Sequence, residues 1–115
     1  MTVACEEDLL AQRRSDQVVI TLPEEIDVTN SPGLRETLLA AISQQSSLVI
    51  ADMRATTFCD SSGMAAIVAT YREAVAVGAD MRLVIAHAGA RRVFELSGID
   101  AVISIYPDLP AALSG

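Results

Sequence analysis

The hydrophobic and polar positions of the chain follow two patterns: short continuous apolar runs, and longer stretches with apolar residues about four positions apart. The first pattern predicts buried strands, and the second predicts the inner face of a helix. Leu34, Leu38 and Ile42 show the second pattern, just after a proline that suits a helix start. We predict strands at 2–10, 17–22, 47–53, 82–86 and 102–105. We predict helices that begin at Asn30 or Ser31, at about 60–77, at 89–96 and at 108–113.

The segments between these elements are typical of turns and helix ends. Residues 13–16 are charged and suit a hairpin turn, which would pair the first two strands antiparallel, and residues 23–27 fit a polar loop. Gly78 and Gly98 follow predicted helices, where a left-handed glycine is favoured. The order of elements predicts an α/β fold with a largely parallel sheet, crossover helices and an antiparallel edge.

Length and composition fit a single domain spanning residues 1–115. Of the 115 residues, 51% are hydrophobic, which suits one folded core. No apolar run approaches the roughly 20 residues needed to cross a bilayer. Glu6, Glu7 and Asp8 stand where a signal peptide would need a basic start and an apolar stretch. We therefore expect a cytoplasmic protein that does not insert into a membrane.

The charge balance narrows the range of partners. The 8 basic residues, all Arg, are outnumbered by 15 acidic ones, for a net charge of −7. A polyphosphate backbone would repel such a chain, and two Tyr and two Phe offer little for base stacking. The absence of Lys excludes a Walker-type phosphate loop, and one His with two distant Cys gives no zinc pattern. We expect no nucleic-acid partner, no metal and no other cofactor.

Residues 58–64 form the segment most suited to chemistry, because they join a predicted strand to a helix start, where open α/β sheets place their sites. In a structural interpretation, Asp60 or Ser61 caps the helix and Gly63 allows close packing. Cys59 ends an apolar run and fits a buried structural thiol. A redox role for Cys59 is the alternative, because Asp60 and a helix start follow it directly.

A functional interpretation uses the serine hydroxyls. A nucleophilic serine needs a base, yet nothing brings His87, which fits a surface or cap residue, to Ser61, and the Gly-x-Ser-x-Gly elbow is absent. We therefore expect no enzyme and interpret the serine as a phosphate acceptor. A phosphate adds about −1.5 to −2 charge, which the helix start partly stabilises and Asp60 opposes. At an apolar docking surface that charge would release a partner while the fold persists.

Three motifs in this order resemble the single-domain STAS proteins of bacteria, the anti-sigma factor antagonists, over about residues 15–113. Residues 60–64 (Asp-Ser-Ser-Gly-Met) are similar to the family's Asp-Ser-Ser/Thr-Gly-Leu. Residues 25–27 (Glu-Ile-Asp), followed by Asn30, resemble its Gly-Glu-Ile/Leu-Asp segment. Residues 92–99 resemble its Arg-hydrophobic-Phe-x-x-Ser/Thr-Gly-Leu.

The resemblance implies a fold and a mechanism. The fold is a four-to-five-stranded mixed sheet with about four helices packed mainly on one face. In the mechanism, the unphosphorylated antagonist binds an anti-sigma factor, a serine kinase of the histidine-kinase-like ATPase fold, and so releases a sigma factor. The kinase then phosphorylates the first Ser of the signature, here Ser61, and a serine phosphatase resets it. The partner-binding residues implied are Asp27, Asn30, Asp60, Ser62, Gly63 and Met64.

The chain departs from the family pattern at three positions. Glu24 replaces the usual Gly, so the loop at this point is expected to differ. Met64 replaces Leu, which conserves volume. Cys59 stands where apolar residues are usual. A second hypothesis also stays open, in which the chain is a non-switching STAS scaffold subunit of a transporter-associated or stressosome-like assembly.

Overall fold

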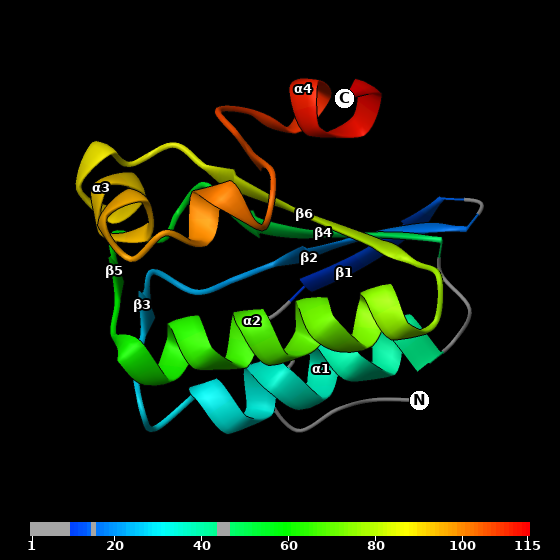
Figure 1. Cartoon of the computed structure of the whole chain (residues 1–115), viewed down its shortest axis with the longest axis horizontal. Coiled ribbons are helices and arrows are strands. Elements are labelled where there is room, and N and C mark those ends of the chain that lie inside the picture. The colour runs from blue at the N-terminus through cyan, green and yellow to red at the C-terminus, as the bar shows by residue number, and fades with distance from the viewer. Residues whose placement is uncertain (1–9, 15, 44–46) are drawn as a thin grey trace.

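The computed structural model describes residues 10–14, 16–43 and 47–115. Its centre is a five-stranded sheet in the order β1-β2-β4-β6-β7 (Figure 1). β1 runs antiparallel to β2, and the other neighbours are parallel, which confirms the predicted parallel sheet with an antiparallel edge. The strands span Leu10–Arg14 (β1), Gln17–Thr21 (β2), Leu48–Met53 (β4), Asp80–Ile85 (β6) and Ile105–Tyr106 (β7).

The central strand β4 is buried along its whole length, as its continuous apolar run predicts. Val49, Ala51 and Met53 belong to the main core, which also contains side chains from α1, α2 and α3. Leu48 and Ile50 point to the other face, where they join a smaller core under α4. The sheet is therefore covered on both faces, although most of the helical packing lies on one.

The helices fall into two layers. α1 and α2 lie side by side on one face of the sheet, and α4 lies on the opposite face (Figure 1). None of the helices in the described ranges is long and apolar enough to cross a bilayer. Their bounds are Ser31–Ser43 (α1), Ser61–Ala76 (α2), Ala88–Leu96 (α3) and Leu109–Ser114 (α4), with a 3₁₀ turn η1 at Ile99–Ala101.

The helix ends follow the sequence signals. Gly78 and Gly98 have φ values of +80° and +82°, so both adopt the left-handed conformation expected after a helix. His87 caps α3, since its Nδ1 accepts the Ala90 N–H at 3.2 Å. Asp108 caps α4 by accepting the Ala111 N–H at 2.9 Å. The cap interpretation of His87 is thereby confirmed.

Two predicted boundaries are wrong for reasons visible in the backbone. Residues 13–14 continue β1 and pair with Val18 and Gln17, so the turn before β2 is shorter than predicted. The last strand was predicted at 102–105, but the N–H groups of Val102 and Ile103 both donate to the Ile99 carbonyl in a helical turn. They are not available to the sheet, so β7 begins at Ile105.

The strand predicted at residues 2–10 lies outside the described residues, except for Leu10.

A third correction concerns residues 23–27, which are not wholly a loop. Glu25–Ile26 forms β3, and it pairs in parallel with β5, Phe58–Cys59, in a separate two-stranded sheet. The Asp60 N–H continues this pairing by donating to the Ile26 carbonyl at 3.0 Å. Because β3 leads into α1 and β5 leads into α2, the short sheet sets the starts of these two helices beside each other (Figure 1).

Gly63 lets the start of α2 approach this short sheet closely. A Cβ at this position would lie 2.5 Å from Cγ2 of Ile26 and 2.7 Å from Sγ of Cys59. Both neighbouring side chains are buried, so neither can turn away into solvent. The structural interpretation of Gly63 therefore has a direct steric basis.

We expect Gly63→Ala to lower the free energy of unfolding by about 1–3 kcal/mol, because the added methyl group overpacks the contact with Ile26 and Cys59. Urea denaturation monitored by circular dichroism measures the change. Gly89→Ala is the matched control, because its new Cβ would meet only the exposed His87 ring at 3.0 Å. Equal losses in the two variants would contradict the close-approach account.

Candidate functional site

Asp60 organises the start of α2 as its N-cap. Its Oδ1 accepts the backbone N–H groups of Ser62 at 2.9 Å and Gly63 at 3.0 Å, and the Ser62 hydroxyl at 2.6 Å. The bond from the Ser62 hydroxyl, followed by that from the Gly63 N–H, holds the pKa of Asp60 below its usual value. Asp60 thus stays ionised and occupies the donors that a helix start would otherwise offer to another anion.

The two serines of the signature, residues 60–64, have different environments. Ser61, the first residue of α2, is exposed, and its hydroxyl has no hydrogen-bond partner within the described ranges. Ser62 is partly buried, and its hydroxyl contacts both Asp60 and the hydroxyl of Ser31, which lies 3.3 Å away at the start of α1. The helix start therefore presents one free hydroxyl to solvent and ties the other into the fold.

The loop before α1 lies beside Asp60 and adds a second carboxylate. Asp27 accepts the backbone N–H and the hydroxyl of Thr29, and the hydroxyl bond is the main reason that the pKa of Asp27 is lowered. The nearby charge of Asp60 acts in the opposite direction on this pKa. The backbone of Val28, in turn, helps to lower the pKa of Asp60, so the two carboxylates lie on neighbouring segments.

The side chain of Asn30 holds this loop together through hydrogen bonds to its backbone. Its Oδ1 accepts the Asp27 N–H at 2.9 Å, and its Nδ2 donates to the Glu25 carbonyl at 2.7 Å. The side chain thereby links β3 to the start of α1. Asn30 shapes the surface next to the signature, even though its own polar atoms are engaged in the loop.

Cys59 is a buried thiol, as the structural interpretation expected. It is 7% exposed, and burial raises its pKa to about 12, with a smaller contribution from the neighbouring Asp60 charge. A thiol held in this protonated form is a poor nucleophile, because the thiolate is the reactive species. The environment of Cys59 thus favours packing over the redox alternative.

An apolar groove of about 420 Å³ begins at Ser61. It lies between α2 and the segment that follows α3, and Met64, Val68 and Ile99 supply its apolar lining. Arg72 stands farther along α2 as its one cationic lining residue. The free hydroxyl therefore lies at the edge of a surface that could receive apolar side chains.

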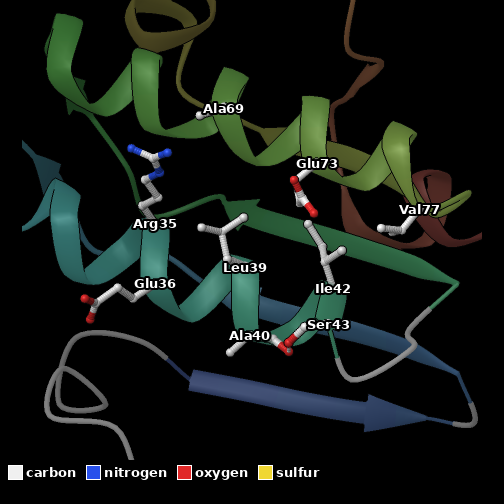
Figure 2. A pocket seen from close by; sticks show the side chains of 9 residues that line it. All are labelled: Arg35, Glu36, Leu39, Ala40, Ile42, Ser43, Ala69, Glu73 and Val77. Carbon is white, nitrogen blue, oxygen red and sulfur yellow. Dashed lines mark hydrogen bonds between the residues drawn. The ribbon is translucent and has the colours of Figure 1, made fainter.

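A second groove runs along the other side of α2, between this helix and α1. Two adjoining cavities of about 540 and 550 Å³ share Arg35, Glu36 and Leu39 of α1. Figure 2 shows Leu39 and Ile42 pointing toward α2, whose side of the cavity is lined by Ala69, Glu73 and Val77. Ser62 and Ala65 line its end nearest the signature.

The structure brings the predicted phosphorylation and partner-binding residues into one region, because Asp27 and Asn30 follow β3, and residues 60–64 follow β5, which pairs with β3. Ser31, Thr29 and Arg72 belong to the same region, although sequence reasoning gave them no role at the site. Ser31 stood out only as a possible helix cap, and no local pattern indicates its contact with Ser62, 31 residues away. Arg91, in the first turn of α3, forms an ion pair with Glu95 at 3.3 Å.

Comparison with known proteins identifies the fold family. Residues 8–112 match the family described as the STAS domain, and the chain belongs to this family. It is 25% identical to an anti-sigma factor antagonist from Mycobacterium paratuberculosis, with a TM-score of 0.84, covering 92% of this chain and 90% of that one. The expected STAS fold and the likeness to anti-sigma factor antagonists are thereby confirmed.

Two further solved structures share this fold. The Bacillus cell fate determinant SpoIIAA in its phosphorylated form is 25% identical, with a TM-score of 0.71, covering 92% of this chain and 96% of that one. The murine Solute Carrier 26 family member A9 anion transporter is 20% identical, with a TM-score of 0.71. That match covers 89% of this chain and 18% of the transporter, so the same fold also occurs within a much larger protein.

We expect the Asp60 cap to stabilise the fold in a pH-dependent way. Because folding lowers the pKa of Asp60 below 3.8, its ionised form favours the native state. This contribution is present above the unfolded pKa and is lost as pH falls through the folded one. Asp60→Asn should therefore be less stable than the wild type at about pH 7, and the gap should narrow at about pH 3.

Urea unfolding of both proteins across this pH range measures the effect. Asp100→Asn serves as the control, because Asp100 is exposed and its side chain has no hydrogen bond within the part of the chain described. A gap between wild type and Asp60→Asn that stays constant with pH would contradict the charged-cap account.

Proposed function

We propose that this chain is an anti-sigma factor antagonist that is switched off by phosphorylation of Ser61. In its unphosphorylated form it binds a serine-kinase anti-sigma factor of the histidine-kinase-like ATPase fold in the cytoplasm, and a sigma factor is released. The kinase transfers phosphate to Ser61, the complex separates, and a serine phosphatase restores the binding form. The chain acts in this scheme as a binding protein, and its partners carry out the catalysis.

The observation that carries the proposal is the free Ser61 hydroxyl at the mouth of an apolar groove. A phosphate acceptor must be reachable by a kinase, and a docking surface must offer apolar area that a partner can bury. Ser61 meets both requirements, because its hydroxyl is exposed and the apolar groove begins beside it. It also lies within a signature that resembles the family's phosphorylated segment. The relative SpoIIAA, itself an anti-sigma factor antagonist, has a structure in a phosphorylated form.

In this proposal, the negative charge of a phosphate on Ser61 releases the bound partner. A phosphate on Ser61 would join the carboxylates of Asp60 and Asp27, so about −1.5 to −2 charge is added to a surface that is already acidic. Asp60 already occupies the N–H groups of Ser62 and Gly63, so these donors cannot neutralise the phosphate. A docked apolar partner would have to desolvate this charge, which disfavours the complex while the fold remains intact.

The docking surface in this proposal is the exposed part of the first turns of α2 together with the Asp27–Asn30 loop. Ala65 lies between the two grooves and lines both, so a partner segment in either groove would contact it. Small residues here let a partner's backbone approach closely. Met64 lines the groove that begins at Ser61 and can adapt its shape to a partner, and Val28 adds an exposed apolar side chain in the Asp27–Asn30 loop.

The scaffold hypothesis remains the alternative, and the murine transporter relative is the observation that favours it. In that case the same surface would hold a permanent partner, and Ser61 would carry no phosphate. Genes for a kinase or sigma factor beside this one would favour the antagonist, whereas permease genes would favour the scaffold.

Incubation with the cognate kinase and ATP should add one phosphate to the wild type and none to Ser61→Ala, because only Ser61 presents a free hydroxyl in the signature. Intact-mass spectrometry measures the gain.

In a pull-down, Ser61→Asp should capture less of the kinase than Ser61→Ala, since its carboxylate mimics part of the added charge. Ser114→Asp, on the opposite face of the sheet, is the charge control. Equal capture by the two Ser61 variants would remove the charge-switch mechanism.

A bulky side chain on the docking surface should block the partner without unfolding the host. We expect Ala65→Tyr to weaken kinase binding at least about tenfold. Ala76→Tyr is the matched control, because it places the same side chain on an exposed position of α2 that lines neither groove. Calorimetric titration of the kinase measures binding, and circular dichroism verifies the fold. Equal affinities for the two variants would place the partner elsewhere.

A further inference from the structure

We propose that Asp60 determines which serine is phosphorylated, by fixing the Ser62 hydroxyl in a structural network and leaving Ser61 as the sole acceptor. This inference rests on the proposed function and adds a specificity-determining residue to it. Two adjacent serines would otherwise offer a kinase two hydroxyls on one helix start.

The first argument concerns the free hydroxyl that phosphoryl transfer requires. Oγ of the acceptor forms a bond to the γ-phosphorus of a nucleoside triphosphate, the bond to the β-phosphate oxygen breaks with its electron pair, and the hydroxyl proton passes to a kinase base. The Ser62 hydroxyl donates to Asp60 at 2.6 Å and accepts from Ser31 at 3.3 Å. The proton and a lone pair of the Ser62 hydroxyl are thus both used in hydrogen bonds. The Ser61 hydroxyl neither donates nor accepts a hydrogen bond within the described ranges.

In the opposite interpretation, the Asp60 carboxylate acts as a base that accepts the proton of the Ser62 hydroxyl and so activates Ser62. Two observations disfavour this. The same oxygen also accepts the N–H groups of Ser62 and Gly63, which makes it a weak base. Ser62 is also partly covered on the side of Ser31, which is only 6% exposed, so an incoming phosphate would meet the start of α1.

The second argument concerns the product. A phosphate on Ser62 would stand against the Asp60 carboxylate that now bonds this hydroxyl, and it would displace the contact between α1 and α2 made through Ser31. A phosphate on Ser61 would project from an exposed position and leave both contacts in place. The fold therefore tolerates the modification at one position and resists it at the next.

The test installs phosphoserine genetically in place of either Ser61 or Ser62 and needs no kinase. We expect phosphoserine at position 62 to lower the folding equilibrium constant, measured in urea, roughly tenfold or more relative to the unmodified protein. Phosphoserine at position 61 should change it by less than about threefold. In the Asp60→Asn background, the penalty at position 62 should fall more than that at position 61, because the opposing charge is gone. Equal penalties at the two positions would overturn the inference.

Mapping the phosphate on protein expressed in its native cells supplies a readout that a purely structural role would not move. The wild type should carry phosphate on Ser61 alone, and Asp60→Asn should add a fraction on Ser62. Phosphate on Ser62 of the wild type would overturn the inference. A wild type with no phosphate on either serine would refute the proposed function, and the two phosphoserine proteins would then still decide whether Asp60 excludes Ser62.

Discussion

The parallel pairing of β3 with β5 is the interaction on which the site depends. The two strands contain only four residues, with Ile26 opposite Cys59, yet β3 is joined to α1 by the short Asp27–Asn30 loop and β5 is joined to α2 by Asp60 alone. The pairing therefore fixes the Asp27 loop beside Asp60 and aligns Ser31 with Ser62 across the two helix starts. Gly63 makes it possible, because any side chain at this position would push α2 away from Ile26. A longer strand pair is not needed, since the five-stranded sheet already holds the ends of β2 and β4 together.

This geometry separates two tasks that a serine at a helix start can perform. Ser62 and Asp60 hold the structure, and Ser61 remains available for chemistry. The same carboxylate that caps α2 also occupies the donors that could stabilise a phosphate, so added charge stays uncompensated at the surface. In the proposed function, this would make a surface with apolar grooves on both sides of α2 sensitive to a single modification of Ser61.

Much of the fold could be predicted from the sequence, and the reasons are particular. The buried run of β4, the spacing of Leu34 and Leu38, and the stops at Gly78 and Gly98 are local signals, and the structure follows them. The β3 half of the short sheet falls within residues 23–27, which were predicted as a loop, because two residues carry no period and their partners lie 33 positions away. For the same reason the Ser31–Ser62 contact was not predictable, and no local pattern distinguishes the environments of Ser61 and Ser62. The two residues after η1 were predicted as strand because both are apolar, but they lie in a helical turn, in which Ile103 fills the core and Val102 is exposed.

The central claim is that charge gained at Ser61 removes a bound protein without refolding its host. The most direct measurement is the ¹⁵N–¹H NMR spectrum of the uniformly labelled chain carrying phosphoserine in place of Ser61, recorded with and without the kinase partner. The account predicts amide shifts confined to the Asp27–Asn30 loop and the first turns of α2, unchanged signals from β2, β4 and β6, and no further change on adding the partner. Shifts that spread through these central strands, or partner-induced changes equal to those of the unmodified chain, would contradict it.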